Sequence, residues 1–129
     1  LTGSNQVANL AITNGTVRGM GGSGIWSQNT KVGVLIDRVR AIGNRQSGFV
    51  MNGGLVIHSV AYRNGSHGIS GNGISVQASM LLGNGGYGLN ANFLSGHGNN
   101  LLSGNALGDV VSGGAQSTSP NRCSGLTCP

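Results

Sequence analysis

The sequence predicts an all-β fold, a parallel β-helix (β-solenoid) of about five coils with a C-terminal cap. Three observations lead to this prediction: a motif that returns about every twenty residues, short apolar runs of strand length, and frequent glycine, with 26 in a chain of 129 residues. A fixed period of this size is typical of stacked repeats, in which each coil contacts only its neighbours. The apolar runs are also too short to form stable helices.

The repeat is clearest at asparagine. Four asparagines recur at this period, each followed closely by a glycine and an apolar residue: Asn44, Asn64, Asn84 and Asn105. A second series runs in step with the first: Asn52, Asn72 and Asn92. Asparagine tolerates left-handed backbone geometry at a bend, and its amide can bond to the same amide one coil above and below. We therefore predict that these asparagines form structural ladders.

The strands are expected in the apolar runs between the glycines. In chain order these runs are residues 7–12, 32–36, 54–60, 73–82 and 99–104. Alignment on the asparagines also stacks one apolar residue from each of four coils, giving a predicted core column of Ile25, Phe49, Ile69 and Leu89. Successive side chains of a strand point to opposite faces, so the residues that follow these four should point outward.

The repeat covers residues 1–111, and residues 112–129 depart from it and are expected to form the cap. Cys123 and Cys128, with four residues between them, predict a small disulfide-closed loop and an oxidising compartment. A zinc site is not expected, because its two further ligands would have to come from His58, His67 or His97, which show no recognisable spacing. The oxidising compartment leads us to expect a secreted protein, either extracellular or at the cell surface. No apolar run is long enough to span a membrane. The start of the chain shows no comparable cap, so either upstream domains or another subunit should cover that end.

Charge is unevenly distributed along the chain. Seven Lys or Arg residues outnumber two acidic residues, and six of the seven precede residue 64. Such a positive field favours acidic polysaccharide or another polyanion, although scattered arginines can also serve solubility alone. Aromatic residues are too few for a nucleic-acid module. The residues predicted to contact a polyanion or glycan are Trp26, Lys31, Arg38, Arg40 and His58.

Three segments of the sequence resemble the repeats of a known family: ITNGTVRGMGGSGI, AYRNGSHGIS and MLLGNGGYGLN. They are similar to the repeats of right-handed parallel β-helix proteins, the pectate-lyase-like superfamily, and the resemblance covers roughly residues 7–111. It implies a right-handed coil. It does not choose an activity, since the family includes lyases, hydrolases, epimerases, phage spikes and adhesins.

Catalytic groups are scarce. The only acidic residues, Asp37 and Asp109, lie more than three coils apart, whereas glycoside hydrolysis needs two carboxylates about 5–9 Å apart. The family resemblance implies elimination with a calcium cluster of several acids and an arginine base, and that acid cluster is missing here. A metal-free lyase using Arg38, Arg40, His58 or Tyr62 stays open. No cofactor and no metal site is predicted.

Two functions from different classes remain. The first is a non-catalytic extracellular solenoid for assembly or surface interaction, whose partner is itself, packed end to end into a fibre, or upstream domains of a longer chain. The alternative is a carbohydrate-active domain, either lyase- or hydrolase-like or a binder of acidic glycan.

Overall fold

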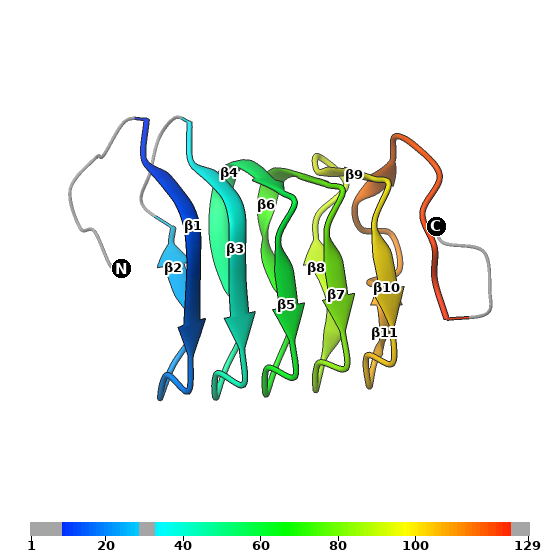
Figure 1. The fold of residues 1–129 in the computed structure, drawn as a ribbon. Coiled ribbons are helices and arrows are strands. Elements are labelled where there is room, and N and C mark those ends of the chain that lie inside the picture. The colour runs from blue at the N-terminus through cyan, green and yellow to red at the C-terminus, as the bar shows by residue number, and fades with distance from the viewer. Residues whose placement is uncertain (1–8, 29–32, 125–129) are drawn as a thin grey trace.

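The protein is described by a computed structural model over residues 9–28 and 33–124. Within these ranges the chain forms an all-β parallel solenoid of about five coils and contains no helix (Figure 1). The predicted fold class is therefore confirmed at the level of the parallel β-solenoid.

The coils are built from short strands that all pair in parallel with the equivalent strand of the next coil. The step between equivalent residues is 24 in the first coil, 20 in the middle coils and 21 toward the C-terminus. The strands of the described residues are β1 (Ala11–Arg18), β2 (Ile25–Ser27), β3 (Leu35–Ile42), β4 (Phe49–Ile57), β5 (Val60–Tyr62), β6 (Ile69–Gln77), β7 (Met80–Leu82), β8 (Tyr87–Ala91), β9 (Gly96–Gly98), β10 (Leu101–Ser103), β11 (Gly108–Val110) and β12 (Gln116–Ser117).

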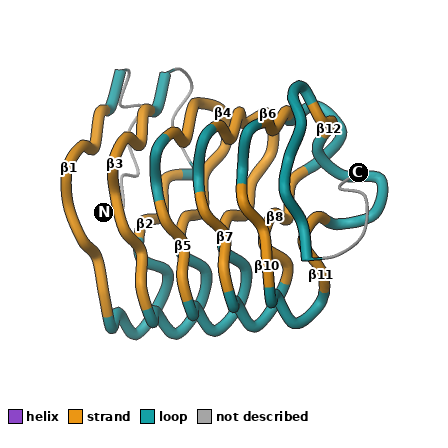
Figure 2. Tube along the Cα trace, turned by 45° about the vertical axis from the view of Figure 1, so that its right-hand side comes forward, coloured by secondary structure: helices purple, strands orange, loops and turns teal. Residues whose placement is uncertain are grey.

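Three strand faces run along the axis of the solenoid. Face 1 holds β2, β8, β11 and the first halves of β4 and β6. Face 2 holds β9 with the second halves of β4 and β6 and the first halves of β1 and β3. Face 3 holds β5, β7, β10 and the second halves of β1 and β3. Figure 2 shows these strands wound around a common interior.

The corners between the faces are columns of left-handed residues. One column holds Asn9, Gly33, Gly53 and Gly73; the next holds Asn14, Arg38, His58, Ala78 and Asn99; the third holds Gly19, Gly43, Arg63, Gly83 and Gly104. The ladder asparagines, expected at such positions from the sequence, do not take positive φ. In the third column the residue just before each asparagine turns the corner instead. This leaves the asparagine's own backbone N–H free to point along the axis.

The core fills the space between the three faces. Ile25, Phe49, Ile69 and Leu89 pair in register from coil to coil, and each is at most 2% exposed. Two further buried columns come from the other faces, and the first of them ends on a histidine: Ile36, Val56, Val76 and His97, and Ala41, Ala61, Leu81 and Leu102.

The chain keeps following the coil beyond residue 111. β12 pairs with β9, and Arg122 forms a parallel bridge with Leu101. Cys123 packs against the core cluster. Its predicted partner Cys128 lies outside the described residues, so the disulfide-closed cap stays a prediction.

Candidate functional site

The first asparagine series forms a continuous ladder of buried amides. At Asn64, Oδ1 accepts hydrogen bonds from the backbone N–H (3.1 Å) and the Nδ2 group (2.9 Å) of Asn44. The Nδ2 group of Asn64 donates to the Ala41 carbonyl oxygen (3.1 Å) and to Asn84 Oδ1 (3.0 Å). Because an amide oxygen has two lone pairs and an amide nitrogen two protons, the side chain is fully satisfied. Fully satisfied buried amides rigidify a core.

A glycine four residues after each of the first three ladder asparagines, Asn44, Asn64 and Asn84, makes room for the next amide. A Cβ added at Gly68 would lie 2.9 Å from Asn84 Nδ2 and 2.7 Å from the Gly88 carbonyl oxygen. Gly48 stands in the same relation to Asn64. These glycines are therefore required by close approach to the ladder, and their φ angles are not positive.

Asp109 accepts a hydrogen bond from Asn105, the last amide of the ladder. Its Oδ1 accepts from Asn105 Nδ2 (3.1 Å), and its Oδ2 accepts from the backbone N–H (2.9 Å) and the hydroxyl (2.8 Å) of Ser124. The carboxylate thus ties the ladder to the C-terminal segment, which is a structural role.

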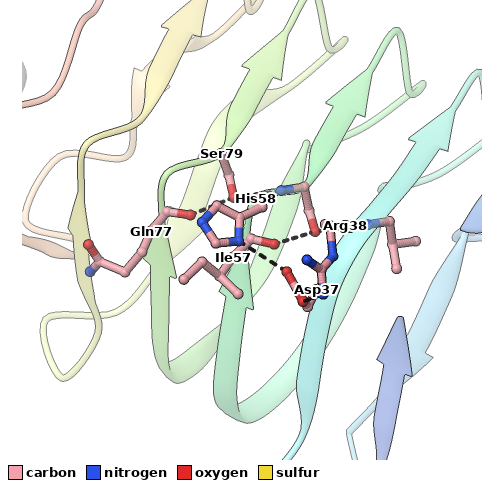
Figure 3. A network of polar contacts seen from close by, with 8 residues as sticks. Asp37, Arg38, Ile57, His58, Gln77 and Ser79 are labelled. Atoms are coloured by element: carbon pink, nitrogen blue, oxygen red, sulfur yellow. Dashed lines mark hydrogen bonds and ion pairs between the residues drawn. The ribbon is translucent and has the colours of Figure 1, made fainter. Parts of the chain in front are cut away.

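A second ladder lies at the corner between faces 2 and 3, and it was not predicted from the sequence. It consists of Ser59, Ser79, Asn100 and Asn121. The Ser59 N–H donates to Ser79 Oγ (3.1 Å), and the Ser79 N–H donates to Asn100 Oδ1 (2.9 Å). Each serine hydroxyl also donates to a carbonyl two residues earlier, as Figure 3 shows for Ser79 and Gln77. Each member follows a first-ladder asparagine by 15 or 16 residues, and this constant offset is the signal that could have found it.

The second predicted series does not form an amide ladder. Asn52 and Asn72 stand in register. However, the Nδ2 group of Asn52 donates to the Gln28 carbonyl oxygen (3.3 Å), and Asn92 Oδ1 accepts from the Gly73 N–H (3.1 Å). Neither bond joins one of these three amides to another, and the prediction of a ladder at these three positions was wrong.

Instead, these asparagines line a polar groove of about 340 Å³ on the outer side of face 1. The Asn52 Oδ1 atom is buried in its wall and has no hydrogen-bond partner within the described residues. Phe93 stands exposed beside the groove. The groove-lining residues are Gln28, Asn52, Ser70, Gly71, Asn72, Asn90, Ala91, Asn92, Phe93, Val111, Ser112, Gly113 and Gly114.

His67 lies at the edge of this groove. Its ring stacks on Tyr87 with centroids 5.9 Å apart, and its Nδ1 accepts the Tyr87 backbone N–H (3.0 Å). A neutral ring that accepts at Nδ1 carries its proton on Nε2, which lies 3.2 Å from the Asn90 amide. The atom of Asn90 that faces Nε2 is Nδ2. Burial lowers the pKa of His67, so the ring is neutral near pH 7.

Asp37 joins two basic side chains at the corner between faces 2 and 3 (Figure 3). Its Oδ2 lies 2.8 Å from Arg38 Nη2, and its Oδ1 lies 3.1 Å from His58 Nδ1. Arg38 and His58 occupy equivalent corners of adjacent coils. Asp37 and Asp109 therefore have separate partners and form no carboxylate pair.

The residues predicted to contact a polyanion or glycan do not form one site. Trp26 is 45% exposed on β2 in face 1. Arg40 lies on face 3, and Arg38 and His58 lie at the corner between faces 2 and 3. Lys31 lies outside the described residues. Over the described ranges there is also no group of three His, Cys, Asp or Glu side chains placed to hold a metal ion, and no helix able to cross a membrane.

Comparison with known proteins identifies the fold. No family model and no curated protein sequence matches the chain. Among solved structures, the periplasmic alginate epimerase AlgG is similar over 93% of this chain with a TM-score of 0.61 and 18% identity, and a mutant of it over 91% with a TM-score of 0.68 and 17% identity. This chain spans 40% of the length of that protein. The expected resemblance to parallel β-helix repeat proteins is thus confirmed for the fold, and AlgG is a carbohydrate-active protein that shares it.

Proposed function

We propose that the protein binds a polysaccharide in the polar groove of face 1 and holds it without cleaving it. The observation that carries this proposal is a row of outward amides on successive coils, one of which has a buried oxygen without a partner among the described residues. Amide and hydroxyl groups both donate and accept hydrogen bonds, which matches the hydroxyl groups of a sugar.

The unsatisfied oxygen supplies binding free energy. A buried acceptor without a partner costs about 1–3 kcal/mol, and a ligand hydroxyl that donates to Asn52 Oδ1 removes this cost. Asn72, one coil further along, is exposed and makes no hydrogen bond within the described residues. Both side chains are therefore available to a ligand without breaking a contact of the folded protein.

Exposed aromatic rings stand on the same face. Trp26 lines a second hollow beside Val50, and Phe93, 65% exposed, borders the groove. The flat apolar face of an aromatic ring can pack against the C–H groups of a sugar ring. A polar floor between aromatic rings supports an extended glycan chain lying along the axis.

The residues that line the groove are suited to binding a glycan and not to cleaving it. None of the groove-lining residues carries a charge. Hydrolysis needs paired carboxylates, and elimination needs a base within hydrogen-bond reach of the sugar. His67, which contacts the groove-lining residue Asn90, is neutral and engaged with Tyr87.

Two further features support a polysaccharide partner outside the cytoplasm. The structurally similar AlgG is a periplasmic alginate epimerase. A Cys123–Cys128 bond would also fit an oxidising compartment and would make residues 112–129 a pinned cap.

Calorimetric titration with oligosaccharides tests this function. Alginate and galacturonate oligomers serve as carboxylated probes, and cello- and manno-oligosaccharides serve as neutral probes. We expect Asn72→Ala to weaken binding of the best probe roughly 5- to 30-fold, the equivalent of one or two hydrogen bonds at about 1 kcal/mol each. Thr16→Ala, an exposed polar residue on face 3, is the matched control.

The pattern of results decides the proposal. Binding that is weaker in Asn72→Ala and unchanged in Thr16→Ala supports it. No binding of any probe, or equal binding by both variants, would overturn it. New unsaturated or reducing ends in the incubated oligosaccharides would overturn the non-catalytic part and favour a lyase or hydrolase.

Assembly is the second candidate, and the free edge of β1 favours it. Within the described residues β1 pairs with β3 alone, so its other edge carries unpaired N–H and C=O groups that can accept a further strand. The strand would come from an upstream part of the same protein or from another copy. Sedimentation analysis of this chain separates the two, because ordered oligomers require another copy and a monomer at high concentration excludes it.

A further inference from the structure

The outer surface of face 3 is apolar at its centre. Two columns of outward side chains cross it from coil to coil, between inward residues that fill the core. In Figure 1 the strands β3, β5, β7 and β10 lie side by side on the near side of the solenoid, and no described segment crosses them. The partly exposed apolar residues of this surface, which we call the apolar face, are Ile42, Val60, Tyr62, Met80, Leu82 and Leu101.

Arginines frame the apolar face. Arg18 and Arg40 stand on the two coils at one end and line a common hollow, and Arg122 continues the column of Leu101 at the other end. Arg63 lies at the corner with its guanidinium 5.0 Å from the centre of the Tyr62 ring. None of these four makes an ion pair within the described residues. An apolar centre with a charged rim, rich in arginine, is the usual anatomy of a protein interface.

The charges indicate what the partner must carry. The whole chain has two acidic residues, and Asp37 and Asp109 are both engaged within their own chain. A second copy would therefore bring arginine against arginine. A glycan also fits poorly, because apolar side chains fill the centre of this face, and the two outward columns offer only the hydroxyls of Thr16, Tyr62 and Ser103 among the described residues.

We propose that the apolar face docks an acidic and apolar segment of a partner protein. The apolar side chains of the segment would cover Val60, Met80 and Leu82, and its carboxylates would pair with the framing arginines. Bidentate pairing with carboxylates is a property of the guanidinium group. The area of one sheet face is small against a standard interface, so binding should be weak and sensitive to salt.

Nuclear magnetic resonance titration with a synthetic peptide tests the proposal. The probe carries leucine and valine at its centre and glutamate at both ends, and two further peptides replace either the glutamates by lysine or the apolar residues by serine. We expect shifts of the backbone amides of β5, β7 and β10 with the first peptide alone. The test variant carries both Arg18→Glu and Arg40→Glu, and the control variant carries Arg45→Glu, which reverses the charge of an exposed arginine away from the apolar face.

The expected loss of affinity for the probe peptide differs between the variants. Reversal of Arg18 and Arg40 should weaken the probe peptide about tenfold, because two rim pairs become repulsive. Leu82→Ser, at a partly exposed position, should weaken it by a similar factor without unfolding the chain. Arg45→Glu alone, on the loop after β3, should leave binding unchanged.

Three outcomes would overturn the proposal. The first is a lack of saturable shifts with the glutamate peptide. The second is a shift pattern confined to the polar groove. The third is binding to vesicles of phosphatidylserine and phosphatidylcholine that the same variants abolish while the peptide does not bind, since this would assign the face to a membrane. Because the apolar face and the polar groove lie on different sides, failure here leaves the glycan proposal unaffected.

Discussion

Removal of one ladder amide should destabilise the whole solenoid. In Asn64→Ala, the backbone N–H and the Nδ2 group of Asn44 both lose their acceptor. A buried donor left without a partner costs about 1–3 kcal/mol, so two such donors predict a loss of about 2–6 kcal/mol. Native domains are stable by about 5–15 kcal/mol, so this loss is a large fraction of the total.

Urea denaturation followed by circular dichroism measures this loss. With a slope of about 2 kcal/mol per molar urea, the midpoint should fall by about 1–3 M. The matched control is Asn72→Ala, which removes the same amide from an exposed position without hydrogen bonds and should change stability by less than about 0.5 kcal/mol. If both variants unfold at the same urea concentration, the ladder contributes nothing to stability and our argument fails.

Replacement of Asn64 by aspartate, its charged isostere, should make the stability of the fold depend on pH. In Asn64→Asp the new carboxyl faces the Ala41 carbonyl oxygen and Asn84 Oδ1, and both these oxygens and burial raise its pKa in the folded state. A raised folded pKa means that the protonated acid is tolerated and the carboxylate is not. Stability should therefore be highest below pH about 4, the unfolded pKa of aspartate, and should decrease as the pH rises through the folded pKa.

Three other predictions concern close contacts, corners and pH. Gly68→Ala should cost at least about 1–3 kcal/mol, because its Cβ would lie 2.7 Å from the Gly88 carbonyl oxygen, whereas Gly22→Ala, with nothing within 4 Å of its Cβ, should be neutral in thermal unfolding. Ala78→Gly should raise the free energy of unfolding by roughly 0.5–1 kcal/mol, because the left-handed geometry at φ 47° costs alanine about 1–2 kcal/mol and glycine loses about 0.5–1 kcal/mol of this gain to entropy; an unchanged melting temperature would contradict the assigned corner. His67 has a lowered pKa when folded, so the unfolded chain binds more protons and stability should fall as the pH drops below 6.5; the slope of urea midpoints between pH 5 and 7 should be smaller in His67→Gln and unchanged in a variant of the exposed Gln46.

The sequence predicts the fold well because the ladder residues are of one type. Asn44, Asn64 and Asn84 keep both their identity and their spacing, so the coils can be aligned by eye and the core column of Phe49 and Ile69 follows. The left-handed corners could not be assigned in this way. Arg63 adopts the same left-handed geometry as the glycines of equivalent coils, and Ala78 shares this geometry with Arg38 and His58, so residue type does not identify the corner.

The second ladder and the groove were missed for a related reason. Along the second ladder serine changes to asparagine between Ser79 and Asn100, and the period changes from 20 to 21 residues at the same point. The groove depends on whether an asparagine points inward or outward, and residue type and period alone do not reveal this direction. Asn64 and Asn72 have the same chemistry, but one is buried and the other is exposed.

The orientation of the ladder amides gives the solenoid an electrical direction. Every amide-to-amide bond from Asn44 to Asn105 runs from the Nδ2 group of one asparagine to the Oδ1 atom of the next toward the C-terminus, so the dipoles of these bonds add along the axis as they do in an α-helix. The Asp109 carboxylate sits at the positive end of this dipole and compensates it. The two ends of the solenoid are therefore not interchangeable, and coils that add to it should do so head to tail, as in a heterologous contact, and not through a two-fold axis.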